Sequence, residues 1–183
     1  DRVSLVQGAA GAVGQCACAL ARHAGALVLA TVRSDNDVAV AERAGAQFTL
    51  VTAGMTGDEL VDQVHSIATN GVDHIVEVAF HANIKTNERL LRQGGSIAAY
   101  ATGNPTPAIP FWPLVFKNVS LHFLGSDDFP IAAKIAAASA LNDVLASGWP
   151  GFEIGMAVPL ESIGIAHEAV EAGNVRGRVV VNP

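Results

Sequence analysis

Short, nearly continuous apolar runs alternate along the chain with segments whose apolar residues recur at helical spacing. The runs have the length and composition of strands, and they cover residues 3–6, 26–32, 47–51, 72–78, 96–101 and 120–124. Strands that are apolar on both sides belong to parallel sheets whose two faces are covered by helices. The pattern therefore predicts an α/β fold, with a doubly wound parallel sheet of about six strands and helices on both faces.

The segments between the runs predict helices that carry the chain from one strand to the next. Leu60, Val61, Val64 and Ile67 show the helical spacing most clearly. The pair Gly94–Gly95 is expected to end the helix that precedes the fifth strand. The expected helices cover residues 12–21, 37–44, 57–69, 83–91 and 130–147.

The regular alternation of predicted strands and helices ends in the second half of the chain. Residues 102–113 hold four of the eight prolines, which predicts a loop rather than a helix. Residues 152–183 predict a strand, a helix and a second strand. A turn rich in glycine begins at Gly148, so we expect one domain over residues 1–148 and a separate C-terminal segment over residues 149–183.

A glycine-rich turn follows the first predicted strand and opens the first predicted helix. Its spacing is Gly8-x-x-Gly11-x-x-Gly14, with Ala9 at the first glycine position of the commoner pattern. Such a turn lets backbone N–H groups approach an anion, and the helix N-terminus adds a partial positive charge. The context predicts a cradle for dinucleotide phosphates, and the alternative is a tight turn without a ligand. The predicted cradle residues are Gly8, Ala10, Gly11, Ala12, Val13 and Gly14.

The end of the second predicted strand bears on which dinucleotide binds. An acidic residue there commonly hydrogen-bonds the ribose of NAD, but here the strand ends Thr31-Val32-Arg33-Ser34. A guanidinium beside a hydroxyl suits a 2′-phosphate, so Thr31, Arg33 and Ser34 are predicted to contact NADPH. Two aspartates follow closely and would repel a phosphate if they pointed inward. The alternative for Arg33 is an ordinary exposed charge at a strand end.

Open α/β sheets bind ligands at the carboxyl ends of their strands. Val78 and Ala79 end the fourth predicted strand, and Ala101 and Thr102 end the fifth. We therefore expect these four residues beside the nicotinamide, where small side chains let a planar ring lie close to the backbone. Small residues are also common at such positions for packing alone.

Candidate acid–base and nucleophilic residues do not converge on one site. The only tyrosine, Tyr100, has Asn104 where a short-chain reductase would have a lysine. Cys16 and Cys18 fall on different sides of the predicted helix, in a spacing that suits neither a disulfide nor a zinc ligand pair. Glu77 is interpreted either as a polar residue near the cofactor or as a buried structural carboxylate. No catalytic or metal-binding residue is assigned, which a hydride-transfer domain tolerates because the cofactor carries the chemistry.

Composition narrows the class of protein further. The formal net charge of −6 and the 5% aromatic content argue against a nucleic-acid partner. No apolar run reaches about 18 residues, and no signal or lipidation motif is present, so no membrane partner is expected. The cysteine usage favours a cytoplasmic setting. Because the chain starts at Asp1 and enters a strand at once, we expect it to be a piece of a longer protein.

Several further stretches extend the picture from single motifs to nearly the whole chain. They cover residues 7–14, 42–46, 71–78, 90–97, 117–121, 159–161, 166–167 and 177–181. In order and spacing they resemble the nucleotide-binding half of the medium-chain dehydrogenase/reductase superfamily, and within it the zinc-less NADPH:quinone oxidoreductase branch. The resemblance implies a Rossmann-like domain preceded by a GroES-like catalytic domain, which residues 149–183 would complete.

Three positions depart from the pattern of the family that the chain resembles. Asp37 stands where members often carry a lysine that holds the 2′-phosphate, so Arg33 and Ser34 must serve instead. Glu77 replaces a commoner aspartate in the fourth strand. The segment Ala79–His81 replaces glycines, which alters the expected nicotinamide pocket.

The resemblance also implies an activity and an assembly. The full-length protein would transfer hydride from NADPH to a quinone or another conjugated carbonyl, and the chain alone would be inactive. The alternatives are a zinc-dependent alcohol dehydrogenase or enoyl reductase of the same superfamily, or an NADPH-binding sensor or structural protein without turnover.

The family pairs subunits through the edge strand, here Ser120–Leu124, where the one ionisable residue is His122. A homodimer through this strand is therefore expected, because pairing removes an exposed sheet edge.

Overall fold

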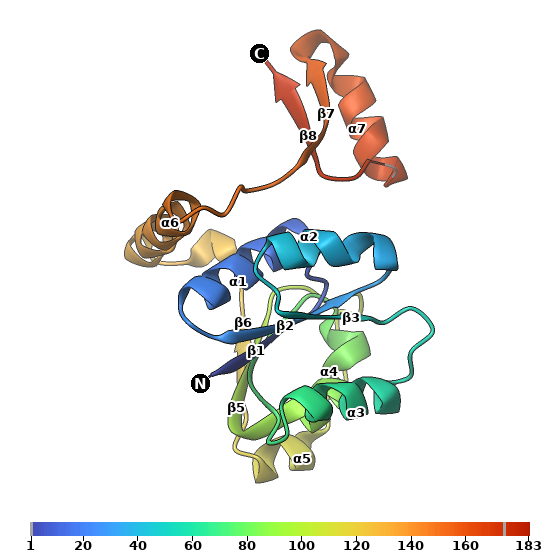
Figure 1. The fold of residues 1–183 in the computed structure, drawn as a ribbon, viewed down its shortest axis with the longest axis vertical. Helices are drawn as coiled ribbons and strands as arrows, with labels where there is room; N and C mark the ends of the chain where they lie inside the picture. Colours follow the sequence, from blue (N-terminus) through green and yellow to red (C-terminus); the bar gives the residue numbers. More distant parts are fainter. Residues whose placement is uncertain (1, 174) are drawn as a thin grey trace. The chain divides into compact units, whose positions relative to one another are not determined.

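Six strands form one parallel sheet, in the order β3-β2-β1-β4-β5-β6 (Figure 1). The strands are β1 (Val3–Val6), β2 (Leu27–Val32), β3 (Phe48–Val51), β4 (Val72–Glu77), β5 (Leu91–Ala99) and β6 (Ser120–Phe123). The order reverses between β1 and β4, so the carboxyl ends of these two strands flank the switch point at which open α/β sheets bind ligands. The predicted α/β class and the doubly wound, Rossmann-like sheet are confirmed.

The computed structural model describes residues 2–173 and 175–183. The chain divides into two compact units, residues 1–149 and residues 150–183. The large sheet and the glycine-rich turn both belong to the first unit.

Helices cover both faces of the large sheet, as Figure 1 shows. One face carries α1 (Ala12–His23) and α2 (Val38–Arg43), and the other carries α3 (Gly57–Ile67), α4 (Phe80–Leu90) and α5 (Phe111–Phe116). A further helix, α6 (Ile131–Ala146), packs against α1. Two short 3-10 turns, Asp35–Asp37 and Ser126–Asp128, complete this unit.

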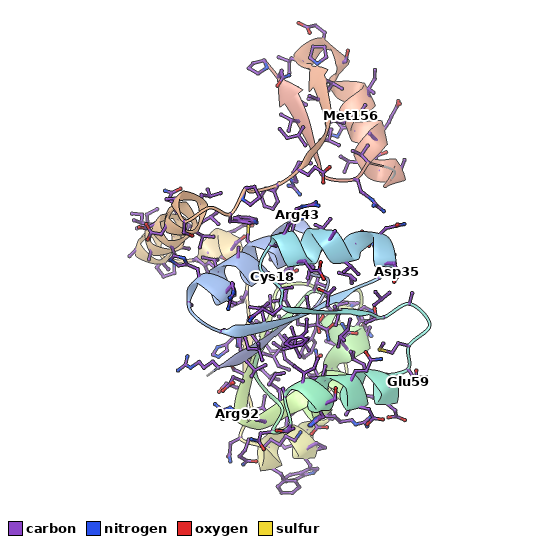
Figure 2. The ribbon with its side chains drawn as sticks, in the orientation of Figure 1. Cys18, Asp35, Arg43, Glu59, Arg92 and Met156 are labelled. Atoms are coloured by element: carbon purple, nitrogen blue, oxygen red, sulfur yellow. The ribbon has the colours of Figure 1, made fainter. Side chains whose placement is uncertain are left out.

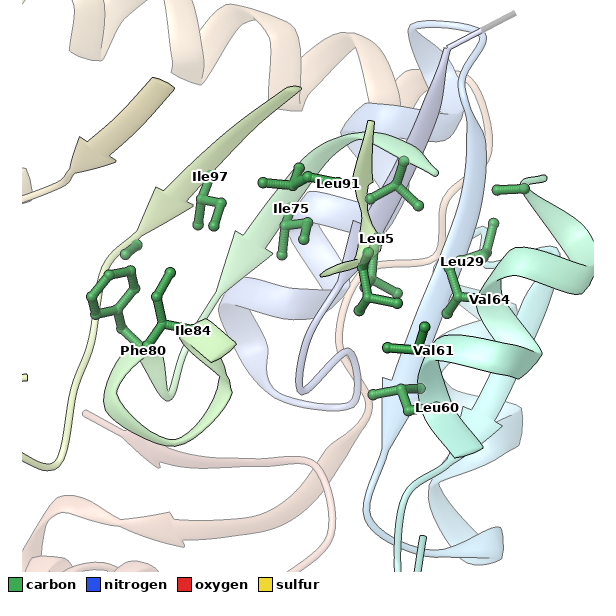
Figure 3. Close-up of a cluster of buried hydrophobic side chains, with 14 of the residues drawn as sticks. Leu5, Leu29, Leu60, Val61, Val64, Ile75, Phe80, Ile84, Leu91 and Ile97 are labelled. Atoms are coloured by element: carbon green, nitrogen blue, oxygen red, sulfur yellow. The ribbon is translucent and has the colours of Figure 1, made fainter. Parts of the chain in front are cut away.

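Two buried clusters hold the helices to the sheet. The larger joins α3 and α4 to the strands, and its members include Leu5, Ile75 and Ile97 from three neighbouring strands (Figure 3). The smaller joins α1 and α2 to the opposite face, with Cys18 fully buried and labelled on α1 in Figure 2. Burial on both faces explains why the strands read as nearly continuous apolar runs.

The helix α3 begins where its sequence signals a start. The side chain of Thr56 accepts the backbone N–H of Glu59, and the Glu59 carboxylate accepts the backbone N–H of Thr56. This reciprocal pair is a capping box, which satisfies two N–H groups that the helix start leaves unpaired. The two hydrogen bonds from Thr56 to the carboxylate lower the pKa of Glu59.

The second unit consists of a small sheet and a helix. Its strands β7 (Ile154–Pro159) and β8 (Arg178–Asn182) pair in parallel, and α7 (Ile163–Ala172) connects them after a 3-10 turn, Leu160–Ser162. Gly173 ends α7 in the left-handed conformation, with φ of 64°. The strand–helix–strand pattern predicted for this segment is confirmed.

The boundaries around α4 and β5 differ from the prediction. The helix starts at Phe80 rather than at residue 83, because the Phe80 side chain is buried in the larger cluster. It passes directly into β5 at Leu91, whose backbone is already extended and pairs with Val72. The pair Gly94–Gly95, predicted to end the helix, lies within β5 instead.

A lysine takes the place of the expected glycine at the C-terminus of α4. The ammonium of Lys117 donates to the carbonyl of Glu88 at 2.6 Å and to that of Leu91 at 3.1 Å. A cation on the last carbonyls of a helix satisfies groups that have no partner within the helix. Lys117 lies 26 residues from Leu91 in the sequence, so no local sequence signal predicts this cap.

The proline-rich segment is not a loop throughout. Residues 111–113 belong to α5, although the prediction placed all of residues 102–113 in a loop. Pro113 is tolerated because it lies in the first turn, where its missing N–H has no partner to lose. The buried side chain of Leu114 fixes this short helix on the larger cluster.

None of the helices in the described part of the chain is both long enough and apolar enough to span a membrane.

Candidate functional site

The glycine-rich turn lies at the switch point, directly after β1. Gly8 has φ of +66°, a conformation that favours glycine, and its N–H donates to the hydroxyl of Thr31 at 3.3 Å. The N–H of Ala9 donates to the carbonyl of Thr31 at 2.9 Å, and the N–H of Gly11 to the carbonyl of Gly8 at 3.1 Å. The end of β2 therefore holds the turn in place.

Two of the three glycines are required by close packing. A Cβ at Gly14 would lie 2.5 Å from the carbonyl oxygen of Gly8 and 2.7 Å from the Cα of Ala9, both backbone atoms. A Cβ at Gly8 would lie 2.9 Å from the Cγ1 of Val78, which follows β4. The glycines thus let α1 approach the turn and let the turn approach β4, which brings two predicted parts of the site together.

The N-terminus of α1 is the part of the turn that fits an anion. Gly11 is its N-cap and makes no side-chain cap hydrogen bond, and the first helical turn contains no acidic residue. The first N–H that bonds within the helix is that of Gln15, which donates to the carbonyl of Gly11. The N–H groups of Ala12, Val13 and Gly14 come before it, so the helix itself does not satisfy them. Gly11 is exposed, and Val13 is 50% exposed. This backbone fits the pyrophosphate of a dinucleotide, because its partial positive charge is accessible.

The end of β2 shows a hydrogen bond that the sequence does not reveal. Thr31 is buried and Arg33 is exposed, while the hydroxyl of Ser34 donates to the carboxylate of Asp37 at 2.8 Å. The segment from Asp35 onward turns toward α2 (Figure 2). The exposed guanidinium of Arg33 therefore provides donors for a phosphate at the end of β2. Ser34 assists only if its hydroxyl proton turns away from the carboxylate of Asp37.

The predicted nicotinamide-end residues come together after β4 and β5. The N–H of Phe80, next to Ala79, donates to the carbonyl of Ala101 at 3.2 Å. The loop that contains Thr102 is fixed by His81, whose Nδ1 accepts the N–H of Gly103 at 2.9 Å. The departure from the family pattern at Ala79–His81 thus has a structural consequence in this loop.

Glu77 is a fully buried carboxylate. It accepts the N–H of Ala79 and the side-chain amides of Asn83, at 3.0 Å, and of Asn87. The interpretation as a buried, hydrogen-bonded carboxylate is therefore confirmed. Burial, and then the negative charge of Glu77, raise the pKa of Tyr100, so this phenol remains protonated near neutral pH.

Gln7 and Asn87 are polar residues of this region that the sequence analysis did not assign to the site. Asn87 is 0% exposed and lies on the same face of α4 as the buried side chains of Phe80 and Ile84, which precede it by seven and three residues. The signal that could have found it is a polar residue on an apolar helical stripe. Gln7 is 5% exposed at the end of β1, beside the glycine turn.

Cysteines and histidines do not form a chemical centre in the described part of the chain. Burial raises the pKa of Cys18 to about 12, so its thiol is inert at neutral pH. Burial, and then the charge of His122, lower the pKa of His74, whose ring contacts the hydroxyl of Ser96 at 2.8 Å. Within residues 2–173 and 175–183, no group of three or more His, Cys, Asp and Glu side chains could hold a metal ion.

A cavity of about 250 Å³ lies at the C-terminal ends of α1 and α2, apart from the glycine turn. Arg22 and His23 of α1 and Arg43 of α2 line it, together with residues near the end of α6. Basic residues at helix C-termini complement the helix dipole, which explains them without a ligand.

The sheet order, the glycine turn at its switch point and the uncapped start of α1 define a dinucleotide-type fold. The family model described as zinc-binding dehydrogenase matches residues 12–138. The chain belongs to this family, in the medium-chain dehydrogenase/reductase superfamily, and corresponds to the nucleotide-binding half of its quinone oxidoreductase-like members.

Similar proteins support this placement. A quinone oxidoreductase from Lama guanicoe is 28% identical over 97% of this chain and 53% of its own length. One from Sus scrofa is 27% identical over 92% of this chain and 50% of its own length. The chain therefore spans about half the length of the curated relatives it matches.

Solved structures confirm the fold. The native structure of a mycobacterial quinone oxidoreductase has a TM-score of 0.88 at 22% identity and covers 100% of this chain and 56% of its own. A mycobacterial structure complexed with NADPH has a TM-score of 0.82 at 23% identity, with the same shares covered.

Proposed function

We propose that the chain is the NADPH-binding domain of an oxidoreductase that transfers hydride to a quinone or another conjugated carbonyl. The observation that carries the proposal is the exposed, uncapped N-terminus of α1, packed on the glycine turn at the switch point of the sheet. The relatives named quinone oxidoreductase support the reaction class, and the neighbour complexed with NADPH supports the cofactor.

The residues of the chain have separate tasks in this proposal. The backbone N–H groups of residues 12–14 bind the pyrophosphate, and the guanidinium of Arg33 binds the 2′-phosphate. Val78 and Ala79 give the nicotinamide a close approach to the backbone after β4. NADPH supplies the hydride when it is bound. The protein supplies binding, orientation and exclusion of competing reactions.

The first test is a titration of the full-length protein with NADPH and with NADH, followed by an assay of NADPH oxidation with a quinone. We expect tighter binding of NADPH, and turnover on addition of quinone. Replacing Arg33 with alanine is expected to weaken NADPH binding about tenfold, by about 1.4 kcal/mol, and to leave NADH binding unchanged.

The control for Arg33 is Arg89→Ala, which removes an exposed arginine paired with Asp58 on another part of the domain. It should leave the affinity for NADPH unchanged. Tighter binding of NADH than NADPH, or no binding of either, contradicts the cofactor assignment. Binding of NADPH without reduction of any quinone or enone favours the sensor or structural alternative.

We also propose that the full-length protein forms a homodimer through β6. This strand is the edge of the sheet, it pairs with β5, and Phe123 on it is 67% exposed. It contains no proline, so its backbone groups are available for pairing with a second copy.

Light scattering of the full-length protein at micromolar concentration should give twice the mass of one chain. Replacing the exposed edge residue His122 with lysine should shift the population toward monomer, because lysines on an edge strand oppose pairing. The exposed His167 of α7 offers a matched control, since His167→Lys leaves the edge unchanged. A monomer in the wild type would refute this assembly.

A further inference from the structure

The side-chain amide of Asn87 joins the ends of two strands beneath the candidate site. Its Oδ1 accepts the Nε2–H of Gln7 at 3.0 Å, and its Nδ2–H donates to the carboxylate of Glu77. Gln7 directly follows β1, and Glu77 is the last residue of β4. One acceptor and one donor are needed at the same position, which neither an apolar residue nor an aspartate carboxylate provides.

From Gln7 the hydrogen bonds lead to the glycine turn. The Oε1 of Gln7 accepts a hydrogen bond from the hydroxyl of Thr31 at 2.6 Å, and the hydroxyl oxygen of Thr31 accepts the N–H of Gly8 at 3.3 Å. Because its amide nitrogen faces Asn87 and its oxygen faces Thr31, Gln7 has one orientation that satisfies both partners.

From Glu77 the hydrogen bonds lead to the turn after β4. The carboxylate accepts the N–H of Ala79, whose φ of −129° and ψ of 55° are neither helical nor strand-like. It also accepts the amide of Asn83 at 3.0 Å, which ties the first turn of α4 to the same group. Glu77 thus fixes the backbone on which the predicted nicotinamide-end residues lie.

The chain of hydrogen bonds is shielded from water throughout. Gln7, Thr31, Glu77 and Asn87 are between 0% and 5% exposed. Water does not replace a lost partner easily at such depth, so each member depends on the next. Asn87 is the link between the branch that holds Gly8 and the branch that holds Ala79.

We propose that Asn87 is a positioning residue of the nucleotide site, which holds the glycine turn and the turn after β4 in one arrangement. The inference rests on the proposed function, because the two turns are the parts that would bind the phosphates and the nicotinamide. Asn87 itself contacts neither turn, so its effect passes through Gln7 and Glu77.

The test is Asn87→Asp in the full-length protein, measured by NADPH titration and by amide hydrogen exchange of the nucleotide-free protein. The new carboxylate faces that of Glu77, and two carboxylates this close repel each other. We expect NADPH affinity to fall at least tenfold, and exchange at both Gly8 and Ala79 to rise at least tenfold relative to wild type.

The groups that hydrogen-bond to Glu77 and Asn87 carry no charge that would offset the new carboxylate. Gln7 and Thr31, which come from β1 and β2, do not ionise, and the two amides of α4 that reach Glu77 do not either. Tyr100 of the β5 end has a raised pKa, so it stays protonated near neutral pH. The control Asn142→Asp makes the same chemical change at an exposed position of α6 and should leave both measurements as in wild type.

The outcomes separate the inference from the proposed function. If wild type binds no nucleotide but Asn87→Asp still raises exchange at both turns, the proposed function fails and the positioning role stands. If Asn87→Asp binds NADPH like wild type, with unchanged exchange at Gly8 and Ala79, the positioning role is refuted. Should Asn87→Asp not fold, Asn87→Ala replaces it, and it must raise exchange at both turns while distant core amides stay protected. A rise at one turn only, or everywhere equally, overturns the inference.

Discussion

Replacing Gly14 with alanine is expected to weaken NADPH binding more than tenfold and to lower the free energy of unfolding by about 2 kcal/mol. The new Cβ would lie 2.5 Å from the carbonyl oxygen of Gly8 and 2.7 Å from the Cα of Ala9. Both are backbone atoms of the turn, so no side chain can rotate away to make room. The start of α1 must move off the turn, which displaces the N–H groups proposed to bind the pyrophosphate.

Denaturant unfolding and nucleotide titration of the full-length protein measure the two effects of Gly14→Ala. The matched control is Gly164→Ala in α7, where an added Cβ meets no atom within 4 Å. That change should raise stability by about 0.5 to 1 kcal/mol, because alanine is the better helix former. Equal behaviour of the two variants would falsify the close-packing role of Gly14.

Replacing Phe80 with alanine is expected to lower the free energy of unfolding by about 3 to 5 kcal/mol. Phe80 is 2% exposed and is among the largest buried side chains of the domain (Figure 3). Its ring also meets that of Phe123 edge-to-face, with centroids 5.4 Å apart. Truncation leaves a cavity at the start of α4, next to Ala79, so nucleotide binding should weaken as well.

Urea denaturation of the Phe80 variant, compared with Phe116→Ala, checks this expectation. Phe116 also lies on a helix that covers the sheet, but it is 72% exposed. Its removal should therefore change the free energy of unfolding by at most about 0.5 kcal/mol. A loss below about 1 kcal/mol for Phe80→Ala would show that the cluster closes over the missing ring.

The elements predicted most accurately are those whose signals are local. The capping pair Thr56 and Glu59 marks the start of α3, and apolar residues at helical spacing mark its buried face. The glycine turn was identified from its spacing between a strand and a helix. The errors fall where distant residues replace local signals, as at the end of α4, where Lys117 satisfies carbonyls that a glycine cap would otherwise leave.

The candidate site divides in the same way. The backbone cradle could be predicted because a glycine pattern determines local geometry. The hydrogen bond from Ser34 to Asp37 also joins near neighbours, yet the sequence permits several rotamers there and the structure has one. Whether the aspartates near Arg33 point inward was a question of side-chain placement, which sequence spacing alone does not answer.

The sequence by itself determined the class of fold, the place of the glycine turn and the family. These follow from periodicity and short motifs, which act through the backbone over a few residues. Only the tertiary structure decided that Gln7, Asn87 and Glu77 form one buried chain of hydrogen bonds beneath the site. Gln7 and Asn87 are 80 residues apart, and a hydrogen bond over that separation exists only once the sheet and α4 have packed together.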